Sequence, residues 1–389
     1  MSIGELSHAP AEAGRAGQLG CVCPPEPSRA LRRRLGIGRL CGGFALVVLA
    51  QALTLGVLPL AGAMLAPPSG SSAVPLSAVP LAAFLFGAAL ASLPASFLLD
   101  TFGRRAAFAL GASLGAAGGM VAGYAMMRGA FPLLVLGAAW LGAAQGFGMF
   151  YRHAAAFGAA PGLRAGTVAR LIGAGALAGL AGPLLARVAE AALAPYTFAG
   201  TLLLAAIAQL GALGFAVALP PARFSHADLT VEAMRDAPMT PASPLAWRAL
   251  ALPTLVGALA WGAMTSAMAG APLALAGCGL GVPLISGVVA WHVVAMYAPA
   301  LAGGVLARRI GATPLALLAL AVCLGAAFMV ARVDAPLTIV AAFLAVGAGW
   351  ALASLATTLM LHAARTPSRL QLAAHDGLLL GAALLGAFI

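Results

Sequence analysis

The sequence consists of apolar runs of about 20 residues or more, separated by short segments that carry nearly all of its charge. A helix of about 20 apolar residues crosses the hydrocarbon core of a bilayer, whereas a soluble domain needs far more polar surface. Of the 389 residues, 62% are hydrophobic and 8% are charged. We therefore expect an all-α integral membrane protein. A transmembrane β-barrel would instead show short segments of alternating polarity.

The apolar runs predict eleven membrane spans. We place them at residues 40–66, 75–99, 106–126, 131–151, 166–186, 195–219, 249–271, 282–305, 313–331, 337–361 and 376–389. The last run, "GLLLGAALLGAFI", would form only about 20 Å of helix, against about 30 Å for the hydrocarbon core.

The distribution of arginine predicts the orientation of these spans. All 21 basic residues are arginines, and cytoplasmic segments of membrane proteins are enriched in them. With the N-terminus inside, eighteen arginines fall in cytoplasmic segments and three in outer loops, namely Arg128, Arg187 and Arg332. We therefore expect a cytoplasmic N-terminus. The same rule explains the net charge of +11 without nucleic-acid binding.

Four regions follow from this arrangement. Residues 1–39 form a polar cytoplasmic tail, 40–219 a six-helix bundle, 220–247 a cytoplasmic linker and 248–389 a second bundle. Within the linker, Ser225 and Asp228 are spaced as a weak capping box, which would begin a short helix.

A short charged motif occurs in both halves of the chain. "SFLLDTFGRR" (96–105) and "GVLARRIG" (304–311) each follow the second span of their half, and they align on Gly103 and Gly311. The first copy carries Asp100, Arg104 and Arg105, and the second carries Arg308 and Arg309, with Arg308 where the acid would stand. Matching cytoplasmic loops indicate two parallel repeats of six spans.

This motif, together with the orientation of the spans, resembles the major facilitator superfamily. Asp100, Gly103, Arg104 and Arg105 match the family's loop signature, whereas Ser96 and Thr101 depart from it. The resemblance implies two pseudo-repeated bundles of six helices, so that span 11 would be cut short here and span 12 missing. It also implies a monomeric transporter in a bacterial inner membrane, with a small-molecule substrate and no cofactor.

Three further segments resemble a subgroup of bacterial permeases, some relatives of which are described as riboflavin carriers. They are "YRHAAAF" in span 4, "WHVVAMYAP" in span 8 and "GAGW" in span 10. In span 4, Gly142 occupies a position where the family has an arginine three residues before the Gln145–Gly146 pair. The signature of proton-driven exporters is therefore incomplete.

On this resemblance, spans 1, 4, 7 and 10 line a central cavity. The polar and aromatic candidates for that cavity are Gln51, Gln145, Trp261, Met264, Thr265 and Trp350. Aromatic and Met side chains along one helical face are more often packing residues than ligand contacts. If they line the cavity, the set suits a neutral or aromatic organic solute.

His292 is the ionisable candidate for a role within the membrane. Polar groups at this depth are costly and often functional, and histidine titrates near neutral pH. We therefore consider contact with substrate or with protons, which are a candidate coupling ion. The alternative is a neutral histidine bonded to a backbone carbonyl.

The charges at the cytoplasmic face predict a latch. In this hypothesis Asp100 pairs with Arg152 and the start of span 11, while Arg104 or Arg105 pairs with Asp376 at a helix N-terminus. These pairs would form when the inner gate closes. The alternative is that the charges only fix the topology.

The sequence favours a transporter over other classes of membrane protein. No nucleotide-binding loop, paired membrane acids or metal-ligand motif is present, so we expect neither an enzyme nor a metal site. The five cysteines show no disulfide or zinc pattern. Two alternatives remain. One is a signalling or transport-deficient membrane protein, and the less favoured one is a membrane-embedded enzyme.

Overall fold

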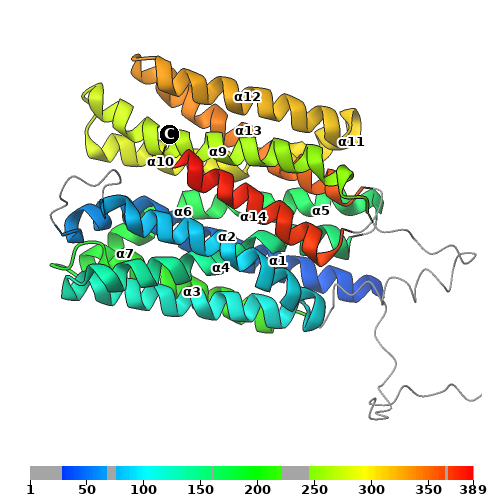
Figure 1. The fold of residues 1–389 in the computed structure, drawn as a ribbon, viewed down its shortest axis with the longest axis horizontal. Helices are drawn as coiled ribbons and strands as arrows, with labels where there is room; N and C mark the ends of the chain where they lie inside the picture. The colour runs from blue at the N-terminus through cyan, green and yellow to red at the C-terminus, as the bar shows by residue number, and fades with distance from the viewer. Residues whose placement is uncertain (1–28, 68–75, 160, 221–244, 364–366, 389) are drawn as a thin grey trace, which may run out of the picture.

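The computed structural model shows a bundle of long helices that run along one common direction (Figure 1). It describes residues 29–67, 76–159, 161–220, 245–363 and 367–388, and every regular element in these ranges is helical. Ten segments of the described chain are long and apolar enough to cross a membrane. The prediction of an all-α membrane protein is confirmed.

The first half of the chain forms one group of helices. It contains α1 (Arg29–Leu65), the short 3-10 helix η1 (Leu76–Ala78), α2 (Val79–Thr101), α3 (Gly103–Arg128), α4 (Phe131–Gly158), α5 (Pro161–Ala174), α6 (Ala176–Ala192) and α7 (Ala199–Val217). The helix α1 begins at Arg29, so part of the predicted tail 1–39 is helical.

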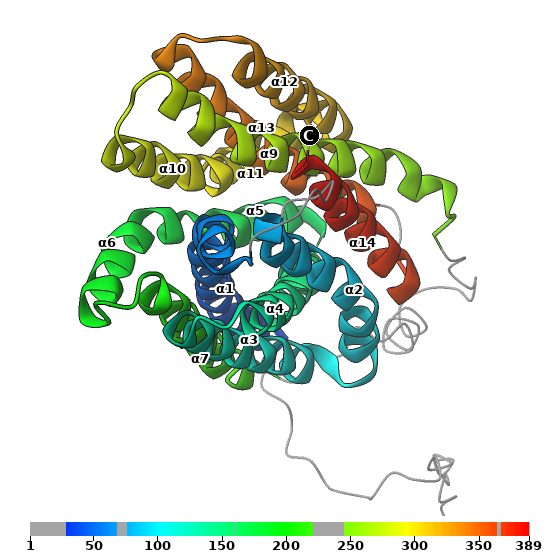
Figure 2. The same cartoon turned by 60° about the vertical axis from the view of Figure 1, so that its left-hand side comes forward.

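The second half forms another group, which lies beside the first (Figure 2). It contains α9 (Arg248–Gly277), α10 (Val282–Tyr297), α11 (Pro299–Ile310), α12 (Ala312–Arg332), α13 (Pro336–Leu361) and α14 (Arg369–Gly386). The groups meet where α14 packs on α2, α11 on α5, and α10 on α6. The predicted linker, with Ser225 and Asp228, lies almost wholly outside the described residues.

Two predicted spans are each broken into two helices, and the broken helices pack against each other. Span 5 becomes α5 and α6 with a break at Gly175, and span 8 becomes α10 and α11 with a break before Pro299. Proline ends a hydrogen-bonded run because it lacks an N–H and clashes with the preceding turn. A Cβ at Gly175 would overlap the ring of Tyr297, so glycine allows the bundles to approach closely here.

The two motif glycines lie at corresponding helix junctions of the two halves. Gly103 separates α2 from α3 with φ 83°, and Gly311 separates α11 from α12 with φ 91°. Side chains disfavour this left-handed region, whereas glycine adopts it readily. Both motif glycines therefore have a positive φ, although Gly103 is the first residue of α3 and Gly311 precedes α12 with ψ 158°.

The start of the last helix differs from the prediction. The helix α14 begins at Arg369, seven residues before the predicted residue 376, because Ser368 and Gln371 form a capping box. Asp376 consequently lies within the helix, so the predicted placement of its carboxylate at a helix N-terminus was wrong.

Candidate functional site

A cavity lies between the two groups of helices. Its lining comes from α1, α4 and α5 on one side and from α9, α10 and α13 on the other, and includes Phe44, Val47, Val48, Gln51, Gln145, Gly148, Met149, Arg152, Ile172, Trp261, Tyr297, Trp350 and Ser354. Because both halves contribute, any movement of one half against the other changes its shape.

Three aromatic rings form one wall of the cavity. The ring centroids of Trp261 and Trp350 are 4.9 Å apart, and those of Tyr297 and Trp350 are 5.6 Å apart. The rings are nearly perpendicular in both pairs, which is a favourable edge-to-face arrangement. The Tyr297 hydroxyl also lies 3.5 Å from Gln51 Oε1, which joins α10 to α1.

Several buried polar atoms around this cavity have no hydrogen-bond partner among the described residues. They are Gln145 Oε1, Arg152 Nε, Trp261 Nε1, Trp350 Nε1 and Ser354 Oγ. Buried polar groups in native proteins are almost always paired, and an unpaired one costs about 1–3 kcal/mol. The residues that carry these atoms line one cavity, which makes this cavity the candidate binding site.

The structure brings four of the predicted cavity residues together, namely Gln51, Gln145, Trp261 and Trp350. Thr265 instead donates a hydrogen bond to the carbonyl of Ala383 on α14, and Met264 is buried in the core. Both pack the second bundle. The role of the four lining residues in binding stays a prediction.

His292 does not reach the cavity. Its Nδ1 lies 2.7 Å from the Phe343 carbonyl, and its ring stacks on that of Phe343 at 3.6 Å. The imidazole is fully buried. Its Nδ1 contact and ring stacking hold α10 to α13, as in the alternative considered above, while its Nε2 has no partner among the described residues.

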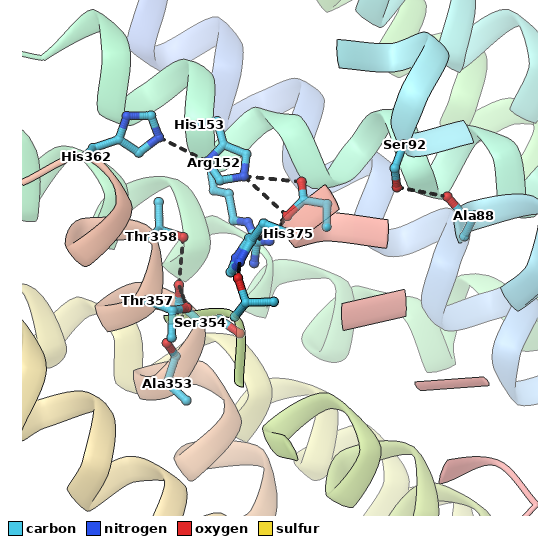
Figure 3. Close-up of polar contacts among 12 residues, drawn as sticks. Ala88, Ser92, Arg152, His153, Ala353, Ser354, Thr357, Thr358, His362 and His375 are labelled. Carbon is cyan, nitrogen blue, oxygen red and sulfur yellow. Dashed lines mark hydrogen bonds and ion pairs between the residues drawn. The ribbon is translucent and has the colours of Figure 1, made fainter. Parts of the chain in front are cut away.

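A network of charged and histidine side chains crosses the interface between the halves. Arg152 on α4 forms a buried ion pair with Asp376 on α14. His153, also on α4, places Nε2 at 3.2 Å from Asp376 Oδ2 and Nδ1 at 3.1 Å from His362 Nε2 (Figure 3). His375, which precedes Asp376 on α14, places Nδ1 at 2.8 Å from the Thr254 hydroxyl oxygen.

The hydrogen-bond directions of this network follow if His153 is neutral. The Asp376 carboxylate accepts from Arg152 and therefore accepts from His153 Nε2–H as well. His153 Nδ1 is then an acceptor, and His362 Nε2–H donates to it. Burial, followed by the charges of neighbouring His153 and Arg164, holds the pKa of His362 well below its usual range. His362 is therefore neutral, and the directions given above apply with His153 neutral as well.

A second layer of contacts lies nearer the end of the bundle. Asp100 pairs with Arg369 at 3.6 Å, and the Ser96 hydroxyl donates to the Arg369 carbonyl. Arg104 Nε donates to the Pro220 carbonyl at 3.3 Å, and Arg164 donates to the His362 carbonyl.

These contacts correct the pairing predicted for the latch. Arg152 pairs with Asp376 and not with Asp100. The described partner of Asp100 is Arg369, the first residue of α14, so the predicted contact of Asp100 with the start of span 11 is present. Arg104 bonds the Pro220 carbonyl, directly after the first bundle, and not Asp376. Three further motif arginines are exposed: Arg105, Arg308 and Arg309.

Sequence reasoning missed His153, His362 and Arg369. The signal for His153 was present, since it adjoins Arg152 near the end of a predicted span. Nothing in the sequence pairs it with His362, because more than 200 residues separate them. Within the described residues, no group of His, Cys, Asp or Glu is placed to hold a metal ion.

No model of a protein family matches the chain. A curated protein from Brucella anthropi, the riboflavin transporter RfnT, is 31% identical over 243 residues. The match covers 62% of this chain and 60% of the relative, so the chain spans about three fifths of that protein's length.

Solved transporter structures share the fold over nearly the whole chain. The proton:xylose symporter XylE from E. coli superposes with a TM-score of 0.69 at 14% identity, covering 93% of this chain and 88% of that one. The human organic anion transporter MFSD10 superposes with a TM-score of 0.65 at 17% identity, covering 94% and 92%. The chain is thus a multi-pass membrane protein with the fold of the major facilitator superfamily.

Proposed function

We propose that the chain is a transporter that moves a small organic solute through its central cavity by alternating access. One observation carries this proposal: residues from both halves line one cavity at their junction, and five of them hold buried polar atoms without a partner among the described residues. The Brucella relative and the solved structures are named as transporters, which supports the same class.

The unpaired atoms describe the solute by complementarity. Trp261 Nε1, Trp350 Nε1 and Arg152 Nε are donors, so they require acceptors on the solute. Gln145 Oε1 requires a donor. The aromatic wall favours a flat ring, since stacked or edge-to-face rings gain about 0.5–1.5 kcal/mol per pair.

Riboflavin is the first solute to test. The relative that matches this chain is named as a riboflavin transporter. Riboflavin carries a flat ring system with carbonyl acceptors and an N–H donor along one edge, which is the pattern that the cavity lining requires.

The contacts between α4, α13 and α14 form the gate in this proposal. They lie toward the arginine-rich end of the bundle, at the right in Figure 1, where α2 and α11 end and α14 begins. We place this end in the cytoplasm of a bacterial cell. For solute to leave on that side, Arg152–Asp376 and Asp100–Arg369 must separate. The exposed Arg105, Arg308 and Arg309 would then anchor the two halves at the membrane surface.

Uptake of labelled riboflavin into liposomes that contain the purified chain tests the proposal. We expect Trp350→Ala to lower affinity about tenfold, measured by quenching of tryptophan fluorescence, with a matching loss of uptake at limiting riboflavin. Trp291→Ala is the matched control, because Trp291 is exposed on α10 away from the cavity. Equal losses in both variants would count against this cavity as the binding site.

The alternative functions give different results in the same assay. A transport-deficient or signalling protein would bind solute without accumulating it in the liposomes. Chemical conversion of the solute during uptake would indicate an enzyme. If no riboflavin binds or enters, a panel of flat heterocycles with a similar polar edge tests the wider claim.

A further inference from the structure

Three of the four histidines in the described residues gather at the contact between the two halves, and the proposed transport cycle does not yet use them. His153 lies on α4, His362 directly after α13 and His375 on α14, and all three are buried. The fourth, His292, lies elsewhere. Clustered ionisable groups at a movable interface are candidates for a switch.

The network is electrically balanced when the halves are in contact. Arg152 carries one positive charge and Asp376 one negative charge, and both are almost inaccessible to water. A proton added to His153 would leave the buried cluster with a net positive charge beside Arg152, at a high cost in desolvation. The closed arrangement therefore favours neutral histidines.

The charged and titratable groups around Asp376 come from every element that surrounds it. The helix α4 contributes Arg152 and His153, α14 contributes Arg369 and His375, and α9 contributes the Thr254 hydroxyl. Near the rim lie His362 after α13, Arg164 on α5 and Asp100 on α2.

We propose that the His362–His153–Asp376 chain is a proton-binding site whose occupancy controls the opening of the gate. When α14 and the end of α13 move away from α4, His153 loses both Asp376 and the N–H of His362. His153 Nδ1 is then free, and it takes a proton from water on the arginine-rich side. The proposal rests on the alternating movement proposed above but not on the identity of the solute.

The direction of the pH effect follows from this exchange. The open form binds a proton that the closed form excludes, so acid favours opening and alkaline conditions favour closure. For one proton, the ratio of open to closed molecules changes little above the ordinary pKa of histidine near 6.5, and by up to about tenfold per pH unit below it.

Two features connect this site to its surroundings. A hollow lined by Asp100, His153 and Arg369 reaches the network from the arginine-rich end. Arg152 also lines the central cavity, where its Nε is unpaired among the described residues. A solute that accepts a hydrogen bond from Arg152 Nε would share one guanidinium with Asp376, which is bound through Nη2, so solute binding and the gate meet at Arg152.

The distance across the gate provides a direct test. Spin labels at Leu163 on α5 and Leu370 on α14 would report the separation, since both residues are exposed and belong to opposite halves. The labels are placed in a full-length, cysteine-free chain in liposomes. Pulsed electron resonance from pH 8.5 to 5 should show longer distances gaining population as pH falls.

The variant His153→Gln with His362→Gln should abolish this pH dependence, because glutamine keeps hydrogen-bonding groups but does not titrate. His292→Gln, outside the network, should retain it. If the double variant does not fold, His362→Gln alone should shift the midpoint. An unchanged midpoint in these variants, or no pH-dependent distance in the parent, would overturn the proposal.

The experiment separates this proposal from the proposed function because the distances require no solute. A pH-dependent gate in a protein that transports none of the tested solutes would count against the proposed function alone. Uptake without any pH-dependent opening would count against the proton site alone.

Discussion

The buried Arg152–Asp376 pair is expected to be the strongest single contact between the two halves. Asp376→Asn would leave the Arg152 charge buried without a partner, which typically costs about 3–5 kcal/mol. We expect a large fall in thermal stability in detergent. Size-exclusion chromatography after heating measures it as the fraction of protein that stays monodisperse. Replacing both residues, as Arg152→Met with Asp376→Leu, should restore much of the loss, because no unpaired charge remains.

The matched control is Asp100→Asn. Asp100 and its partner Arg369 are partly exposed, and pairs of this kind contribute about 1 kcal/mol or less. A loss at Asp100 as large as that at Asp376 would contradict this ranking and would restore Asp100 as the centre of the latch.

Individual residues could be predicted from the sequence only where a local signal marked them. Gln51, Gln145, Trp261 and Trp350 are polar or aromatic groups within apolar runs, and the family resemblance placed their spans around a cavity. The contact between His153 and His362 depends on how the two halves meet, which no local pattern encodes.

At the scale of elements, Gly142 allows α2 and α4 to pack backbone to backbone. A Cβ at this position would fall on the Phe84 carbonyl oxygen, which explains why the family's arginine cannot stand there in this chain. Overpacking of this kind costs about 1–3 kcal/mol. We therefore expect Gly142→Ala to lower the unfolding temperature.

Gly214→Ala on α7 is the matched control for that substitution. It lies on an exposed helical surface with no atom within 4 Å of the new Cβ. Alanine should be neutral or slightly stabilising there, because it favours the helix by up to about 1 kcal/mol over glycine. Equal stability of the two variants would show that α2 and α4 are not in close contact.

Boundaries of elements were less predictable than their existence. Hydropathy located each helical region, but the start of α14 depends on a hydrogen-bonded pair, Ser368 and Gln371, in a polar segment that hydropathy assigned to a loop. The break at Gly175 was likewise hidden, because a glycine within a long apolar run is compatible with a continuous helix.

For the whole molecule, the arginine distribution predicts that the end of the bundle carrying the gate faces the cytoplasm. Moving one of these charges across a membrane is costly, so the orientation with eighteen arginines inside is favoured. Single cysteines in a cysteine-free chain test this with a thiol reagent that does not cross membranes. Thr101→Cys, at the end of α2, should react only after intact cells are permeabilised.

Ala335→Cys provides the opposite case, since it lies in the exposed turn between α12 and α13 at the other end of the bundle. It should react in intact cells. The reverse pattern would invert the topology, and the proposed proton site would then respond to the pH outside the cell. Equal reaction at both positions would mean that the chain inserts in two orientations. We do not expect this result, because the outer loops contain few arginines and the cytoplasmic segments contain many.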